Sequence, residues 1–235
     1  MGGEGSSGRG LAVHALGLVA IVLGLASAAS AVSAPSAGDE NDRLVGTPDR
    51  DSLHGHGGDD RLLGRGERDH LRGGTGNDLL VGGPGHDAMI GGDGNDRYLG
   101  GPGTDWLRET TRAKPGGFDG ADVMRGGRGF DVLRSGVGDD RIYGGGMTDP
   151  IRGGAGRDLI VGGDGGDRAI YGDGGRDRIY GGAGNDLIIS IRDKNASDLV
   201  DCGPGASDVA LVDREDRVRD CEERSRGHVR ALGAR

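Results

Sequence analysis

The sequence predicts an all-β fold, a solenoid in which short strands alternate with glycine-rich turns. The main evidence is a nine-residue pattern that recurs without a gap from Gly73 to Arg108, as GGTGNDLLV, GGPGHDAMI, GGDGNDRYL and GGPGTDWLR. The composition gives a second indication, because the 235 residues include 54 glycines and 38 acidic residues but only 3% aromatic residues. Such a composition is typical of disordered or periodic chains, and the strict repeat favours a periodic fold.

Each position of the nonapeptide has a physical role. Glycine at positions 1, 2 and 4 lets the backbone adopt left-handed and crowded conformations in a tight turn. The last three residues are extended, so the large apolar residue at position 8 faces inward while its neighbours face outward. Carbonyl groups of the turn and the aspartate at position 6 can together surround calcium, which prefers oxygen ligands. The pattern therefore predicts calcium sites along both edges of the solenoid.

This G-G-x-G-x-D-x-U-x pattern resembles the RTX, or haemolysin-type, calcium-binding repeats. The resemblance implies a right-handed parallel β-roll with two nonapeptides in each coil. It also implies that several calcium ions are the cofactor, each held between the turns of successive coils on one side.

The repeat frame divides the chain into segments. It places eight repeats in residues 37–108, an insertion in residues 109–116 and eight further repeats in residues 117–189. Position 6 is aspartate and position 8 is apolar in every one of these repeats. The first four are degenerate, with Thr47 and Asp49 among the residues that replace turn glycines. We expect such turns to bind calcium weakly or not at all.

The predicted calcium ligands come from position 6 and from the turn glycines at positions 2 and 4. The aspartates are Asp60, Asp78, Asp87, Asp96, Asp105, Asp122, Asp131, Asp140, Asp158, Asp167, Asp177 and Asp186. The glycines, whose backbone is expected to help hold the ions, are Gly74, Gly76, Gly83, Gly85, Gly92, Gly94, Gly101, Gly103, Gly127, Gly129, Gly154, Gly156, Gly163, Gly165, Gly182 and Gly184.

Electrostatic repulsion supports a metal at these positions. Equivalent aspartates one coil apart, such as Asp78 and Asp96, should stack near the strand spacing of about 4.8 Å. Two carboxylates at about 5 Å repel each other by roughly 3 kcal/mol at an effective dielectric constant of about 20, and a divalent cation between them reverses the sign. The alternative, that the aspartates only cap their turns, does not explain a carboxylate in every turn. We therefore expect the calcium-free chain to be largely unfolded.

Residues 1–34 are predicted to be a secretory signal peptide. Arg9 precedes an apolar run from Leu11 to Leu25, and a stretch of small residues with the A-x-A site Ala29–Ala31 follows. An uncleaved membrane anchor is the alternative, but the apolar run is short of the roughly 20 residues that span a bilayer. We expect a secreted, extracellular protein whose mature chain has no stable membrane span.

Residues 190–235 are predicted to form a short C-terminal cap and a basic tail. The regular spacing of the glycines ends at Ser190, and two degenerate repeats follow. This segment resembles the closing segment of many actinobacterial secreted repeat proteins. Cys202 and Cys221 are the only cysteines, and an exported chain permits a disulfide between them, with free thiols as the alternative. Such a bridge would pin the tail over the last coil.

The sequence offers no catalytic site. It contains no H-E-x-x-H, no G-x-S-x-G and no phosphate-binding loop. His54, His56 and His70 occupy different repeat positions, so we interpret them as solvated side chains. The net charge of −9 argues against a nucleic-acid partner, since backbone phosphates require a basic surface.

We therefore predict a secreted, non-enzymatic calcium-binding protein that folds when it meets calcium outside the cell. One alternative is a calcium-dependent adhesion or cell-surface interaction module. That module would use outward arginines and the aromatic residues Tyr98, Trp106, Tyr143, Tyr171 and Tyr180. An enzyme built on the surface of the roll is a less favoured alternative.

Overall fold

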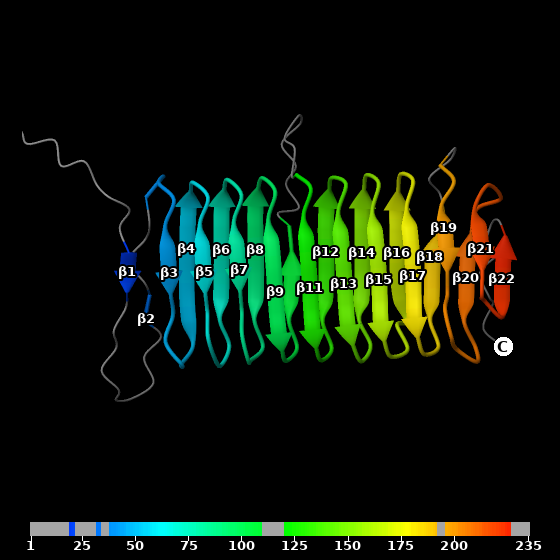
Figure 1. Ribbon diagram of the computed structural model, residues 1–235, viewed down its shortest axis with the longest axis horizontal. Coiled ribbons are helices and arrows are strands. Elements are labelled where there is room, and N and C mark those ends of the chain that lie inside the picture. Colours follow the sequence, from blue (N-terminus) through cyan, green and yellow to red (C-terminus); the bar gives the residue numbers. More distant parts are fainter. Residues whose placement is uncertain (1–18, 22–31, 34–37, 110–119, 192–195, 227–235) are drawn as a thin grey trace, which may run out of the picture.

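The computed structural model describes residues 19–21, 32–33, 38–109, 120–191 and 196–226. These residues form a parallel β-solenoid made of two sheets (Figure 1), and none of them is helical. The predicted all-β parallel solenoid is confirmed. Because none of the described residues is helical, no helix long and apolar enough to span a membrane is found in this part of the chain.

Successive strands alternate between the two sheets, which we call the odd sheet and the even sheet after their strand numbers. The odd sheet has 11 strands, in the order β1 (Val19–Ile21), β3 (Arg43–Val45), β5 (Arg61–Leu63), β7 (Leu79–Val81), β9 (Arg97–Pro102), β11 (Val123–Arg128), β13 (Arg141–Gly146), β15 (Leu159–Asp164), β17 (Arg178–Ala183), β19 (Leu199–Asp201) and β21 (Arg217–Arg219).

The even sheet also has 11 strands, in the order β2 (Val32–Ser33), β4 (Asp51–Gly57), β6 (His70–Thr75), β8 (Ala88–Asp93), β10 (Trp106–Arg108), β12 (Val132–Val137), β14 (Pro150–Ala155), β16 (Ala169–Gly174), β18 (Leu187–Ser190), β20 (Val209–Val212) and β22 (Glu223–Arg226). Each coil therefore contains one strand of each sheet, as two nonapeptides per coil require.

The position-8 side chains form the core between the sheets. Each is at most 2% exposed, and each lies in register with its counterpart one coil away, as Ile142 does with Ile160. These residues are Leu44, Leu53, Leu62, Leu71, Leu80, Met89, Tyr98, Leu107, Met124, Leu133, Ile142, Ile151, Ile160, Ile170, Ile179 and Ile188.

The structure corrects one prediction about the aromatic residues. Tyr98 was expected among the outward side chains of an interaction surface, but it is fully buried because position 8 of the repeat faces the core. Trp106, at position 7, is 59% exposed. Tyr143 and Tyr171 lie at the outer face, where each receives the guanidinium of a stacked arginine, at 5.0 Å from Arg125 and 5.1 Å from Arg152.

The turns explain why glycine occupies positions 2 and 4. All the glycines predicted as ligands at these positions have positive φ, for example 137° at Gly74 and 123° at Gly76. At several positions where other residues replace these glycines the backbone keeps this conformation, with φ of 79° at His56 and 78° at Met147. Such residues disfavour positive φ, so these degenerate turns are strained.

The insertion does not interrupt the sheets. β9 pairs with β11 and β10 pairs with β12 in the register used elsewhere, so Tyr98 lies beside Met124 and Leu107 beside Leu133. Glu109, the first residue of the predicted insertion, is described and buried, whereas residues 110–116 lie outside the described residues. Of the predicted insertion 109–116, the structure therefore describes only Glu109.

Both ends of the solenoid continue beyond the intact repeats. The predicted C-terminal cap consists, over its described residues, of further coils, since β19 to β22 extend both sheets and place Val200 and Val218 in line with Ile179. At the other end, β1 and β2 come from the segment predicted to be a signal peptide and pair with β3 and β4. The rest of that segment and residues 227–235 of the basic tail lie outside the described residues.

Candidate metal sites

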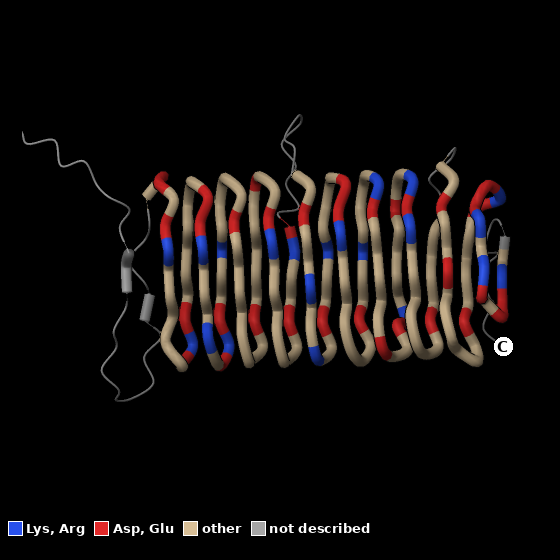
Figure 2. The backbone as a smooth tube through the Cα atoms, viewed as in Figure 1, with Lys and Arg blue, Asp and Glu red and all other residues tan. Residues whose placement is uncertain are grey.

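Acidic residues gather at the turns along both edges of the solenoid (Figure 2). The position-6 aspartates form two continuous ladders there, because the backbone N–H of each donates to Oδ1 of the aspartate one coil further on. The distances are 2.8 Å from Asp60 to Asp78 and 2.7 Å from Asp78 to Asp96. One carboxylate oxygen of each residue thus joins neighbouring coils.

The two ladders run the length of the described chain. The first contains Asp42, Asp60, Asp78, Asp96, Asp122, Asp140, Asp158, Asp177, Asp198 and Asp216. The second contains Asp51, Asp69, Asp87, Asp105, Asp131, Asp149, Asp167, Asp186 and Asp208, and ends on Glu222. All the predicted aspartate ligands therefore lie in the ladders.

The second carboxylate oxygen, Oδ2, distinguishes these residues from ordinary turn caps. In most turns this atom is buried and has no hydrogen-bond partner among the described residues. The aspartates concerned include Asp60, Asp69, Asp78, Asp87, Asp96, Asp105, Asp131, Asp149, Asp158, Asp167, Asp186 and Asp208. Burying a charged oxygen without a partner is costly, so these atoms require a proton or a cation.

Two kinds of oxygen atom lie close to the glycine at position 1. A Cβ atom added to Gly73 would collide with Asp78 Oδ2 and would lie 2.8 Å from the carbonyl oxygen of Gly91, one coil further on. The same two oxygen types surround Gly82, through Asp87 and the carbonyl of Gly100. Carboxylate and carbonyl oxygens are the ligands that calcium prefers, so the residues present fit the ion.

The glycines at positions 2 and 4 also bring carbonyl groups to the turns. The carbonyl oxygen of Gly74 lies against Gly92, and that of Gly76 against Gly94, so closely that no side chain fits between the coils. The structure therefore places both predicted sets, aspartates and turn glycines, along the same edges. The carbonyl of position 1 was not among the predicted ligands, although glycine recurs at position 1 as regularly as at positions 2 and 4.

Burial raises the pKa of these carboxyl groups. The pKa is about 6 for Asp78 and Asp87 and about 7 for Asp96 and Asp158. Desolvation of the charged form is the largest cause, and the N–H bond from the preceding coil opposes it. Repulsion from the neighbouring aspartate of the ladder adds to the rise, for example from Asp105 on Asp87. The ladders thus concentrate carboxylates that a bound cation would stabilise.

Two aspartates omitted from the predicted ligands share this environment. Asp69 and Asp149 belong to repeats with altered turns, yet their Oδ2 atoms are buried like the others and burial raises the pKa of each to about 7. The sequence signal for them was the unbroken aspartate at position 6. It was outweighed by the missing glycines at Arg65, Glu67 and Met147, whose backbones keep the turn conformation nonetheless.

Asp51 has a different environment from the other members of its ladder. Its Oδ2 accepts hydrogen bonds from the backbone N–H of Thr47 at 2.6 Å and from the Thr47 hydroxyl at 3.1 Å. Neither Thr47 nor Asp49 has a positive φ, so this turn departs from the repeat conformation. The turn is therefore satisfied by its own donors without an ion.

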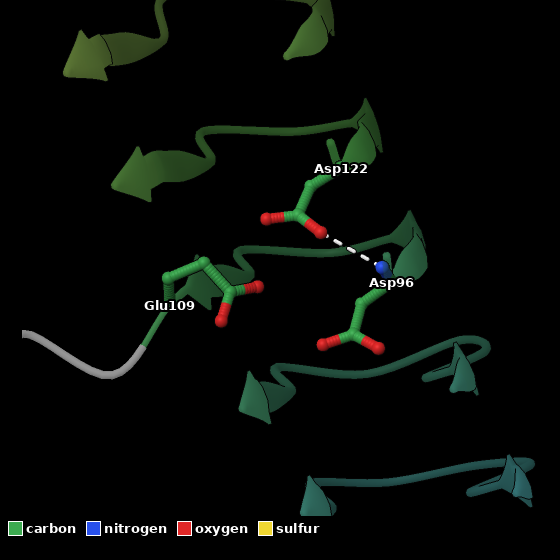
Figure 3. Close-up of side chains that lie close together, drawn as sticks. All are labelled: Asp96, Glu109 and Asp122. Atoms are coloured by element: carbon green, nitrogen blue, oxygen red, sulfur yellow. Dashed lines mark hydrogen bonds between the residues drawn. The ribbon is translucent and has the colours of Figure 1, made fainter. Parts of the chain in front are cut away.

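One turn contains a third carboxylate, which the sequence did not identify (Figure 3). Asp96, Glu109 and Asp122 each offer a carboxylate oxygen, and these oxygens lie within 4.8 Å of one another. All three residues are buried. The repeat frame assigned Glu109 to the insertion, and only its place directly after β10 could have identified it as part of a coil.

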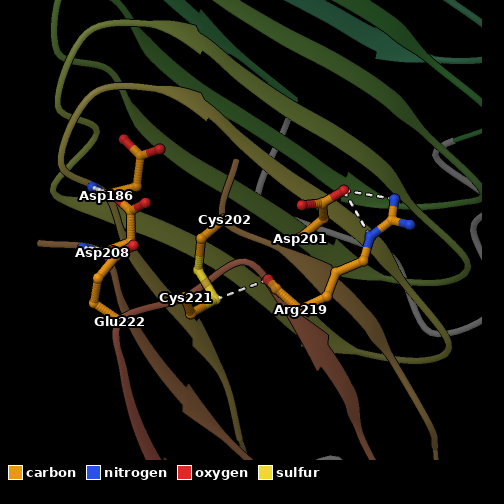
Figure 4. Close-up of a disulfide and its surroundings, with 7 residues drawn as sticks. All are labelled: Asp186, Asp201, Cys202, Asp208, Arg219, Cys221 and Glu222. Atoms are coloured by element: carbon orange, nitrogen blue, oxygen red, sulfur yellow. Dashed lines mark hydrogen bonds and ion pairs between the residues drawn. A yellow bond between two sulfur atoms is a disulfide. The ribbon is translucent and has the colours of Figure 1, made fainter. Parts of the chain in front are cut away.

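The predicted disulfide is confirmed (Figure 4). Cys202 and Cys221 are bonded, and the 19 residues that separate them in sequence are close to one coil. Beside the bridge, Arg219 forms a 2.6 Å ion pair with Asp201, and Glu222 accepts the last hydrogen bond of the second ladder. The disulfide therefore fastens the final coil to the coil before it.

Comparison with protein families agrees with this geometry. The model of the RTX calcium-binding nonapeptide repeat matches residues 36–71, 72–107, 116–149, 143–169 and 169–190. These segments cover more than half of the chain, so the protein belongs to the RTX calcium-binding repeat family. Its repeats bind calcium, and the buried acidic groups are consistent with calcium sites. A comparison with curated proteins gave no match.

Proposed function

We propose that this protein is secreted, has no catalytic role and folds into the solenoid when calcium binds to its turns outside the cell. The observation that carries the proposal is the row of buried Oδ2 atoms along each edge that have no hydrogen-bond partner in the described part of the chain. Each ion would bind between Oδ2 of a position-6 aspartate and turn carbonyls of adjacent coils.

The balance of forces supports coupling between calcium binding and folding. Without cations, folding brings ionised carboxylates together and removes them from water, and both effects oppose the folded state. The core is narrow, because each nonapeptide contributes a single fully buried apolar side chain. An ion that binds only the folded coil shifts this balance towards folding.

Two features support an extracellular location. Residues 1–34 have the order of regions expected of a signal peptide. The bond between Cys202 and Cys221 is typical of proteins that fold in oxidising compartments. Extracellular calcium modules bind at about 0.1–1 mM, which suits a protein that stays unfolded before export.

Calcium titration of the mature chain tests the proposal. In chelator the circular dichroism spectrum should be that of a disordered chain, and added calcium should convert it cooperatively to a β spectrum. Magnesium should substitute poorly because it requires a tight octahedral shell and gives up water reluctantly. A chain that is equally ordered in chelator and in calcium would contradict calcium-dependent folding.

A second candidate function is calcium-dependent binding to cell surfaces. It is favoured by a hollow on the even sheet that is lined by His70, Ala88, Trp106, Arg108 and Arg134, with the Trp106 ring exposed. Labelled protein should then bind cells in calcium but not in chelator, and Trp106→Ala should abolish this binding without changing the calcium midpoint. Equal binding by both proteins would remove this candidate.

A further inference from the structure

Glu109 occupies a coil position that is glycine in most repeats. Its backbone N–H donates to the carbonyl of Arg134 at 3.0 Å, as the N–H of Gly64 does to Val81 and that of Gly82 to Leu99. Glu109 therefore stands at position 1 of its coil, in line with Gly91 in the coil before. A glutamate at this position adds a side-chain carboxylate where glycine has no side chain.

The Glu109 side chain is fixed by donors from the preceding coil. Its Oε2 accepts a hydrogen bond from the N–H of Gly92 at 3.0 Å, and its Oε1 accepts one from the Tyr98 hydroxyl. The Tyr98 hydroxyl in turn accepts from the N–H of Gly91 at 2.6 Å. Tyr98 is the one position-8 residue of the repeats that carries a hydroxyl, so this tyrosine and this glutamate are matched to each other.

The site also contains a buried carboxylate, that of Asp96, which lies near the carboxylate of Glu109. Asp96 is 1% exposed, and its Oδ2 has no hydrogen-bond partner among the described residues. A Cβ atom added to Gly91 would collide with this oxygen and with the Tyr98 hydroxyl. Asp122 reaches the cluster from the next coil, where its Oδ1 accepts the N–H of Asp96 at 2.7 Å (Figure 3).

We propose that Asp96, Glu109 and Asp122 form a calcium site with three carboxylates, and that this site fills before the ordinary turns. The separation of the three oxygens, within 4.8 Å, suits ligands that share an ion with bonds of about 2.3–2.6 Å. Calcium affinity rises with the number of charged ligands, and the ordinary turns lack the third carboxylate. The ion would join the coils on either side of the insertion.

This inference rests on the calcium-dependent folding proposed above, and the test separates the two. It compares Glu109→Gln with Glu223→Gln in the full chain, because both remove one carboxylate but Glu223 is exposed on β22 and outside the cluster. Native mass spectrometry at rising calcium counts the ions bound to each chain. Wild-type protein that binds no calcium would contradict the proposed function itself.

For the cluster, we expect Glu109→Gln to weaken the first bound ion by roughly tenfold or more and to leave the later ions in place. Glu223→Gln should bind as the wild type does. If the two variants take up their first ion at the same calcium concentration, Glu109 serves only as a hydrogen-bond acceptor in the core and the proposal is wrong.

Terbium decides the question if Glu109→Gln does not fold. Terbium takes the place of calcium and emits when a nearby tyrosine is excited, and the Tyr98 hydroxyl contacts Glu109 directly. The first equivalent of terbium should give sensitised emission that Tyr98→Phe largely removes and Tyr180→Phe retains. Equal emission from these two variants would overturn the proposal.

Discussion

The turns that contain Asp51 and Asp87 lie in the same ladder but use their carboxylates differently. Both residues donate their N–H groups to the aspartate one coil further on. Asp51 Oδ2 accepts hydrogen bonds from Thr47, whereas Asp87 Oδ2 is buried beside Gly82 and has no partner within the described ranges. An aspartate at position 6 therefore does not by itself define a calcium site. Whether its second oxygen is left for an ion depends on the donors of its own turn, which for Asp51 are the N–H and hydroxyl groups of Thr47 at position 2.

The largest expected effect is a dependence of folding on pH. It involves all the open turns together, by which we mean the turns whose aspartate Oδ2 is buried without a hydrogen-bond partner among the described residues. Burial raises the pKa of Asp78 to about 6 and of Asp96 to about 7 in the folded chain, whereas the ordinary value is 3.8. Well below pH 4 these carboxyl groups are protonated in both the folded and the unfolded chain, so they destabilise neither state. As the pH rises to about 7, the unfolded chain releases its protons first, so folding becomes less favourable.

Calcium-free protein should therefore be more ordered near pH 4 than near pH 8, so that acid partly replaces calcium. Thermal melts followed by circular dichroism in metal-free buffer measure this difference. The calcium midpoint should fall as the pH rises from 5 to 8, because the ion competes with protons for the same oxygens. Stability in metal-free buffer that increases with pH would show that the aspartates are not buried as charged groups.

The next effect is expected from removing single carboxylates. Asp87→Ala should raise the calcium midpoint and lower the free energy of unfolding in calcium by about 2–4 kcal/mol, because a site loses a charged ligand. Asp51→Ala should cost only about 1 kcal/mol, the size of a lost turn cap, and leave the midpoint unchanged. Calorimetric titration and urea unfolding measure both quantities. Equal midpoints for the two variants would show that the Asp51 turn binds calcium like the others.

A gain of function sharpens the same comparison. The double variant Thr47→Gly with Asp49→Gly gives the sequence GGPGRD, which restores glycine at positions 2 and 4 and removes the hydroxyl donor to Asp51. We expect it to bind one more calcium ion per chain than the wild type, counted by native mass spectrometry. Thr47→Ser keeps the donor and should bind the wild-type number. An unchanged count in the double variant would mean that glycines alone do not open the turn.

The regular parts of the molecule were predictable because their geometry repeats. One coil spans 18 residues between ladder partners such as Asp60 and Asp78, so a strict nonapeptide frame determines register, core and edge together. Closure of the Asp51 turn was not predictable in detail, because it depends on the hydroxyl and N–H of one residue, Thr47. The sequence did predict that this repeat would bind poorly.

The irregular parts were missed because their contacts join residues that the frame separates. The hydrogen bond between Tyr98 and Glu109 links a core position to a residue counted as part of the insertion. After Ser190 the sequence still indicated two degenerate repeats, and Asp198 and Asp208 of these repeats continue the two ladders. Only their spacing was irregular, since 21 and 22 residues replace the regular 18 there.

The smallest expected effect concerns the disulfide, which acts on the last coil alone. Cys202 is fully buried, and its bond to Cys221 fastens the coil that carries β21 and β22. The bridge closes a loop of about 20 residues, for which the chain-entropy model gives roughly 3 kcal/mol of local stabilisation. The open turns of the central repeats lie many coils away and keep their ligands when the bridge is broken. Reduction should therefore speed hydrogen exchange in β21 and β22 and promote end-to-end association through the exposed strands, while the calcium midpoint of the chain stays the same. Hydrogen exchange measured by mass spectrometry, with calorimetric titration of the same reduced sample, tests both halves of this prediction. A shifted calcium midpoint after reduction would show that the last coil is coupled to the central sites, as it would be if folding began at the C-terminal end.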